Sequence, residues 1–116
     1  VRVEFSRCGG TYVLRMTGHA GQADVGHDVV CAAATILCYT AAQTALDLYE
    51  QGKLRKRPRV DVDRGDATVT RGDLTGDLIP RQDAAGEAAV ALRTVATGFA
   101  LLSHHYPEYV TFRREP

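Results

Sequence analysis

Apolar and polar residues alternate along the start of the chain, on both sides of a Gly9-Gly10 pair. The apolar positions are Val1, Val3 and Phe5 before the pair and Tyr12, Leu14 and Met16 after it. A period of two residues is typical of a strand with one buried face, and a Gly-Gly pair favours a tight turn, so this pattern predicts a β-hairpin. A second hairpin is predicted around Arg64-Gly65-Asp66, with the alternating residues Val60, Val62, Ala67 and Val69.

Two longer stretches have apolar residues at spacings of three and four. The first stripe is Val30, Ala34, Leu37, Ala41, Ala45 and Leu48, and the second is Ala85, Ala88, Leu92, Val95, Phe99 and Leu102. These spacings follow the turn of an α-helix and predict one apolar face on each of two helices. Gly52 and Pro107 are expected to end them. A last short strand is predicted over residues 109–112.

The predicted order is therefore ββαββαβ, an α+β fold with a mostly antiparallel sheet and two helices packed on one face. The 116 residues suit a single domain over residues 1–116. The other face of the first hairpin carries Arg2, Glu4, Val13 and Arg15, which is mostly polar and can stay in contact with water.

The amino-acid composition indicates which partners and which cell compartment to expect. The 14 basic and 14 acidic residues balance, so we expect neither direct nucleic-acid binding nor attraction to a membrane surface. No apolar run is expected to approach the ~20 residues that span a bilayer. The start VRVEFSR has no signal-peptide character, and the 3 cysteines, an odd number, are expected to be reduced thiols. We therefore expect a cytoplasmic protein.

One segment concentrates reactive side chains. Gly18–Cys31 (GHAGQADVGHDVVC) holds one of the 3 cysteines and two of the 4 histidines. Asp28 is expected to cap the first helix by accepting a hydrogen bond from the Cys31 N–H. Cys31 then lies in the first turn, where the helix dipole stabilises a thiolate nucleophile. Because the Asp28 carboxylate opposes a thiolate, a cationic partner is needed, and His19 and His27 are the candidates.

Other interpretations remain open from the residues alone. Cys31 could be a small core residue, as we expect of Cys38. Zinc could use His19, His27 and Cys31 with an aspartate, although the paired Cys-x-x-Cys spacing of structural zinc sites is absent. The basic run Lys53–Arg59 could contact phosphates or simply complement a helix C-terminus. The two Arg-Gly-Asp triplets, Arg64–Asp66 and Arg71–Asp73, are expected to be turns, and His104-His105 to bond the last carbonyls of the second helix.

The same segment resembles a known family. Gly18-His19-Ala20, Gly26 and the run DVVCAA at residues 28–33 are similar to the G-H-A … G-x-D-[IV]-V-C-A-A signature of the bacterial ribosomal-processing cysteine proteases. Residues 98–102 and 106–109 also resemble that family's last helix and strand. The resemblance implies that Cys31 and His19 form a catalytic dyad. Asp28, Gly18 and Gly26 would support it, and so would Thr35, which stands where many members have serine.

The family resemblance also implies a reaction and its partners. Members remove the N-terminal extension of the twenty-seventh protein of the large ribosomal subunit, cutting after aromatic residues, without a cofactor or metal and as homodimers. A loop would close over the substrate, formed by Ala20, Gly21, Gln22, Ala23, Asp24, Val25 and His27 together with Gly26. The alternative is a non-catalytic ribosome-associated binding module that uses Lys53–Arg59.

Overall fold

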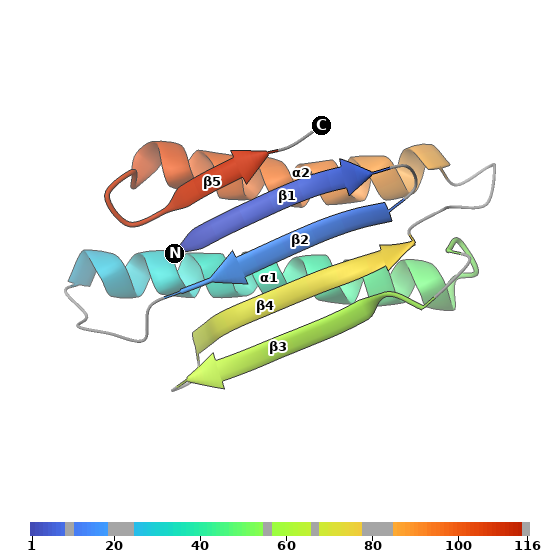
Figure 1. Ribbon diagram of the computed structural model, residues 1–116, viewed down its shortest axis with the longest axis horizontal. Helices are drawn as coiled ribbons and strands as arrows, with labels where there is room; N and C mark the ends of the chain where they lie inside the picture. The colour runs from blue at the N-terminus through green and yellow to red at the C-terminus, as the bar shows by residue number, and fades with distance from the viewer. Residues whose placement is uncertain (9–10, 19–24, 55–56, 66–67, 78–84, 115–116) are drawn as a thin grey trace.

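The elements follow the predicted ββαββαβ order. The computed structural model describes residues 1–8, 11–18, 25–54, 57–65, 68–77 and 85–114. The elements are β1 Arg2–Cys8, β2 Thr11–Thr17, α1 Val25–Glu50, β3 Arg59–Gly65, β4 Thr68–Asp77, α2 Ala85–His105 and β5 Thr111–Arg114 (Figure 1).

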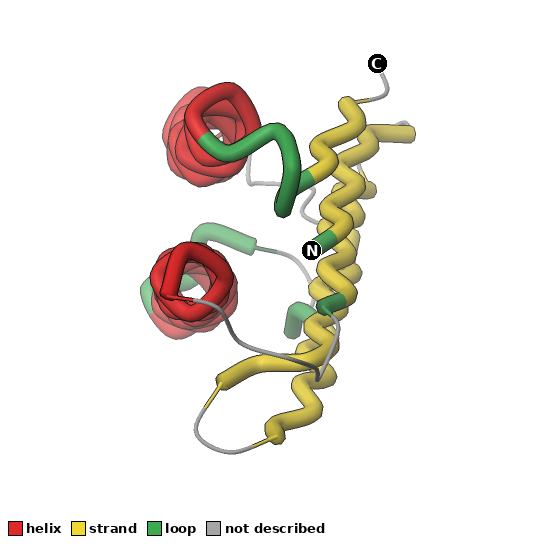
Figure 2. Tube along the Cα trace, turned by 90° about the vertical axis from the view of Figure 1, so that its left-hand side faces the viewer, coloured by secondary structure: helices red, strands yellow, loops and turns green. Residues whose placement is uncertain are grey.

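The strands form one sheet in the order β3-β4-β2-β1-β5. Neighbouring strands are antiparallel except β1 and β5, which run parallel because α2 carries the chain back between β4 and β5. Both helices cover the same face of the sheet, as Figure 2 shows. The prediction of a mostly antiparallel sheet with two helices on one face is confirmed.

The core lies between this sheet and the helices. Val3 pairs with Met16 and Phe5 with Leu14, so the alternating apolar residues of the first hairpin point to one face. The largest fully buried side chains are Phe99, Met16, Val3 and Val30. On the uncovered face Arg2 and Arg15 are exposed and Glu4 and Val13 are half-buried, as the sequence pattern predicts.

The ends of the elements partly match the predicted ones. Gly52 has a positive φ of 74°, and the N–H groups of Gly52 and Lys53 donate to the carbonyls of Tyr49 and Leu48, which is a Schellman stop at the predicted residue. The last strand begins at Thr111, later than predicted. Its expected first residues, Tyr109 and Val110, instead donate both their N–H groups to the Tyr106 carbonyl in a turn.

One predicted turn is wrong. Arg71-Gly72-Asp73 lies inside β4, where Gly72 pairs with Met16 of β2 and with Val62 of β3. The antiparallel ladders on both sides satisfy the backbone there, so the tripeptide continues the strand. Gly72 is buried between these two partners.

α1 is more apolar over its length than the sequence analysis expected. By length and composition alone, Val29–Glu50 could cross a membrane. In the fold this helix lies on the sheet with Ala34, Ala41 and Ala45 almost completely buried, as the core helix of a globular domain does. The length and composition of one such helix are therefore weak evidence for a membrane span.

Candidate active site

The two elements next to the predicted dyad residues in the sequence meet at one end of the sheet. β2 ends at Thr17 and leads through Gly18 to His19, and α1, which carries Cys31, begins at that same end of the sheet (Figure 1). Gly18 is half-buried. His19 lies outside the described residues, so the pairing of His19 with Cys31 stays a prediction.

The start of α1 corrects the predicted role of Asp28. The helix begins at Val25, so Asp28 belongs to its first turn and is not the N-cap. An aspartate in the first turn still complements the positive end of the helix dipole.

This earlier start changes what the helix does for Cys31. Cys31 lies in the second turn of α1, so its N–H belongs to the intrahelical ladder and is not one of the unpaired terminal groups. The dipole effect is largest in the first turn. Stabilisation of a thiolate therefore depends more on a cationic partner than the sequence analysis expected.

Cys31 lies on the flank of α1 that faces away from α2. It is half-buried, and Thr35 and Cys38, one and two turns further on, are exposed by only 9% and 6%. Ala33 and Leu37 lie on the opposite flank and line a groove against α2. Residues four and seven apart share one side of a helix, so the Thr35 hydroxyl lies on the Cys31 side.

The predicted substrate loop is only partly described. Val25, Gly26 and His27 belong to α1 and not to a loop, which corrects the predicted boundary. Residues 20–24 lie outside the described residues. Within the described part of the chain, no group of three or more His, Cys, Asp or Glu residues could hold a metal ion. This leaves the zinc alternative untested, because His19, Asp24 and the side chains of His27 and Asp28 are not described.

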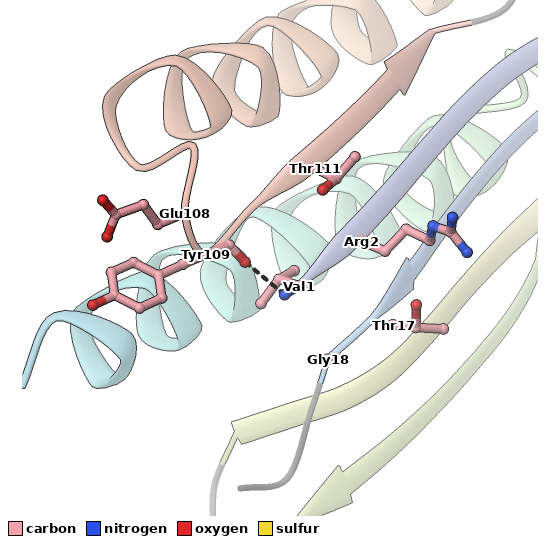
Figure 3. Close-up of a pocket in the computed structure, with 7 residues that line it drawn as sticks. All are labelled: Val1, Arg2, Thr17, Gly18, Glu108, Tyr109 and Thr111. Atoms are coloured by element: carbon pink, nitrogen blue, oxygen red, sulfur yellow. Dashed lines mark hydrogen bonds between the residues drawn. The ribbon is translucent and has the colours of Figure 1, made fainter. Parts of the chain in front are cut away.

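A pocket that the sequence analysis missed lies beside Gly18. It has a volume of about 390 Å³ and is lined by Val1, Arg2, Thr17, Gly18, Glu108, Tyr109 and Thr111 (Figure 3). The backbone joins its walls, because the Val1 nitrogen donates to the Tyr109 carbonyl at 2.7 Å and Thr111 N–H donates to the Val1 carbonyl at 2.9 Å. No sequence motif signals this pocket, because it depends on the parallel pairing of β1 with β5.

A second hollow is the groove between the helices. It has a volume of about 580 Å³ and is lined by Ala33, Ile36, Leu37, Gly98, Leu101, Leu102, His105 and Tyr106. Ile36 and Leu101 are 62% and 55% exposed, so this outer surface is apolar. His104 and His105 are both exposed, with their rings 5.6 Å apart edge to face.

The basic run lies away from the candidate site. It follows the C-terminal end of α1, at the opposite end of the sheet from the start of that helix (Figure 1). Arg57 and Arg59 are exposed, whereas Leu54 and Pro58 within the run are buried. Leu54 and Pro58 therefore anchor the connection to β3 by their apolar side chains.

Comparisons with known proteins point to one family. The family described as cysteine protease Prp matches residues 1–111. No curated protein matches the chain. Among solved structures, SMU.848 from Streptococcus mutans superposes with a TM-score of 0.74 and 22% identity, covering 97% of this chain and 91% of that one.

Two further structures are of an essential ribosomal processing protease Prp from S. aureus. The complex with a substrate peptide has a TM-score of 0.63 and 17% identity. The complex with a covalently linked product peptide has a TM-score of 0.62 and 19% identity, and both cover 98% of each chain. At these identities the structural likeness establishes a shared α+β fold.

Proposed function

We propose, because the chain belongs to the family of the cysteine protease Prp, that Cys31 is its nucleophile and His19 its general base. The protein is a cysteine protease, and Cys31 is the described thiol that fits this role better. Cys31 is half-buried near the start of α1, whereas Cys38 is buried in the core. The observation that carries the proposal is that β2, which precedes His19 in the sequence, ends at the end of the sheet where α1 begins.

In the proposed reaction His19 takes the Cys31 thiol proton while Sγ attacks the scissile carbonyl carbon. The tetrahedral intermediate collapses to a thioester, and His19 gives its proton to the leaving amine. His19 then removes a proton from water, which attacks the thioester, and Cys31 leaves as the thiolate. The imidazolium formed in the first step supplies the cationic partner that the thiolate needs.

The oxyanion of this intermediate needs N–H donors. Because the Cys31 amide lies in the helical ladder, we expect donors from the unpaired N–H groups at the start of the first turn, residues 25–27. Asp28, in that turn, would act by orienting His19. Thr35 would act from one turn beyond Cys31.

The proposed substrate is the N-terminal extension of the twenty-seventh protein of the large ribosomal subunit, whose removal would be required for ribosome assembly and function. Its support is the family, together with the S. aureus relative that is described as a ribosomal processing protease bound to a substrate peptide.

The test is incubation of the protein with that ribosomal precursor, followed by sequencing of any new N-terminus. We expect one cut, directly after aromatic residues. A matched precursor with those aromatic residues changed to alanine should stay intact. An uncut natural precursor would refute the substrate, and equal cutting of both precursors would refute the aromatic preference.

We further propose that the protein works as a cytoplasmic homodimer. The outer surface of the helices supports this, because Val29, Ile36 and Leu101 are more than half exposed there. Near the end of α2, Tyr106 is also exposed, at 38%, whereas Phe112 packs partly against the core. Sedimentation at micromolar concentration should give twice the monomer mass, and Ile36→Glu should shift it to one monomer mass. A wild-type protein that sediments as a monomer would refute the dimer.

The non-catalytic alternative has less support. The family is one of cysteine proteases, and Leu54 and Pro58 of the basic run are buried. No nucleic acid is therefore included in the proposed function.

A further inference from the structure

One edge of the sheet is formed by β3. In the described part of the chain this strand lies at the end of the strand order, next to β4, and borders the sheet on the side away from β5 (Figure 1). The outer side of an edge strand carries main-chain N–H and C=O groups that can pair with another strand. β3 runs over the seven residues Arg59–Gly65, which is long enough for such pairing.

The segment at this edge, residues 57–63 (RPRVDVD), alternates between charged and apolar residues. All its charged residues are exposed, whereas Pro58 is buried and Val60 and Val62 are half-buried against the core. The pairing of β3 with β4 shifts register between Asp63 and Arg64, directly after this segment. The regular part of the edge therefore has one charged face and one apolar face.

The charges of this segment complement each other when its direction is reversed. The two charged residues before Val60 are positive, and the two after it are negative. In an antiparallel pair of two such segments with Val60 opposite Val60, Arg59 lies opposite Asp61 and Arg57 lies opposite Asp63. The two-fold symmetry of the pair repeats both contacts, and Pro58 then faces Val62 on the apolar side.

Other registers lose this match. A shift of two residues in one direction puts Asp61 opposite Asp61, and a shift in the other direction puts Arg59 opposite Arg59. Like charges directly opposite each other destabilise a strand pair, whereas opposite charges stabilise it. The charge pattern therefore selects one register and one partner, a second copy of the same strand.

We propose that the edge of β3 binds the edge of β3 in a second copy of this chain, antiparallel and with Val60 at the two-fold axis. The two sheets then continue as one, with the helices of both copies on the same face. One strand pair buries little surface, so we expect a weak contact with a Kd of about 100 μM. This β3 contact is separate from the proposed contact between helix surfaces and independent of the proposed reaction.

The experiment is sedimentation equilibrium of the Ile36→Glu protein from about 10 to 500 μM. This background removes the proposed contact between helix surfaces, so the remaining association reports the β3 contact. Arg59→Asp and Asp61→Arg are added singly, and circular dichroism checks that each variant is folded. The matched control is Arg2→Asp, which changes an exposed arginine on β1 of the same sheet.

Each single change at the edge turns attractive pairs into repulsive ones, so we expect it to raise Kd by about tenfold. The control should leave Kd unchanged. An equimolar mixture of the two edge variants should associate with the Kd of the background protein. In the mixed pair the new acidic residue at position 59 faces the new basic residue at position 61, and the native Asp61 and Arg59 face each other.

Three outcomes would overturn the proposal. If the background protein stays monomeric over the whole range, the β3 contact does not form. If the edge variants associate as well as the background protein, its contact lies elsewhere. If both variants lose association and their mixture does not regain it, residues 59 and 61 do not face each other. A wild-type protein that is monomeric at micromolar concentration would refute only the contact between helix surfaces, because the β3 contact is measured at higher concentration.

Discussion

α1 and α2 lie side by side on the same face of the sheet (Figure 2), yet they bury different kinds of side chain. Among the residues of α2 whose burial is described, 90–105, the most buried are all apolar: Leu92, Val95, Ala96 and Phe99. The inward side of α1 includes Thr35 and Cys38, with Cys31 half-buried one turn before Thr35. Because a buried hydroxyl contributes less to a core than an apolar side chain does, this difference agrees with the proposed site on α1, although Ala34, Ala41 and Ala45 of the same helix also belong to the core.

The strongest test of the proposed site on α1 is Cys31→Ala, for which we expect the largest effect on activity. Cleavage of the ribosomal precursor should fall by a factor on the order of 10⁴ or more, because the nucleophile is lost. The fold should survive, since alanine is a good helix former. Circular dichroism and a cleavage assay on the same preparation measure both.

Cys38→Ala is the matched control on the same helix. It should keep the activity and cost about 1 kcal/mol of the free energy of unfolding, because Cys38 is a small buried side chain. Iodoacetamide near neutral pH should accordingly modify Cys31 much faster than Cys38. Substantial activity in Cys31→Ala would show that Cys31 is not the nucleophile.

The converse change in α2 is Phe99→Ala, in a side chain with 0% exposure. It should lower the free energy of unfolding by about 3–5 kcal/mol through lost burial and the cavity left behind. Denaturant unfolding measures this. At a temperature where the variant is still folded, kcat for the precursor should change little. A large loss of kcat in folded protein would mean that α2 takes part in the chemistry.

The periodic parts of this comparison were predictable from the sequence. The stripe of α2 and the first hairpin follow repeating patterns, and each buried position adds to the same prediction. Gly52 ends α1 as predicted because only a residue that tolerates a positive φ fits that stop.

The start of α1 was harder to predict. Asp28 is a good residue for an N-cap and also for the first turn, so the sequence alone does not separate these positions. The pocket beside Gly18 was not predictable at all, because its walls come together only when β5 pairs with β1.

The third prediction compares two histidines that flank the start of α1. His19→Ala should lower kcat by on the order of 10²-fold or more, because general base catalysis is lost. His27→Ala should have a much smaller effect, since residue 27 belongs to the first turn of α1. Single-turnover cleavage of the precursor measures both. The reverse ranking would make His27 the base, and loss of wild-type activity in a chelator would support the metal alternative.

The smallest effect is expected where the two helices touch, at Gly98→Ala. A Cβ at residue 98 would lie 2.8 Å from Leu37 Cδ2, which is too close unless the end of that side chain moves. Leu37 is half-buried and borders the open groove between the helices, so it has room to turn. Alanine also favours a helix interior over glycine by about 1 kcal/mol. These opposing terms should leave Gly98→Ala within about 0.5 kcal/mol of the wild type in chemical denaturation.

Making Gly98→Ala in a Leu37→Ala background separates the cost of the close contact from the helix preference of alanine. With the Leu37 side chain removed, Gly98→Ala no longer meets Cδ2 and should stabilise the fold by about 1 kcal/mol, the full helix preference. If Gly98→Ala instead costs more than about 2 kcal/mol with Leu37 present and nothing without it, Leu37 is held rigidly and the helices cannot adjust. If the cost is the same in both backgrounds, the close approach at Leu37 is not its cause. The expected result would mean that the contact between α1 and α2 tolerates added volume, in contrast to the buried Phe99 position one residue further along the same helix.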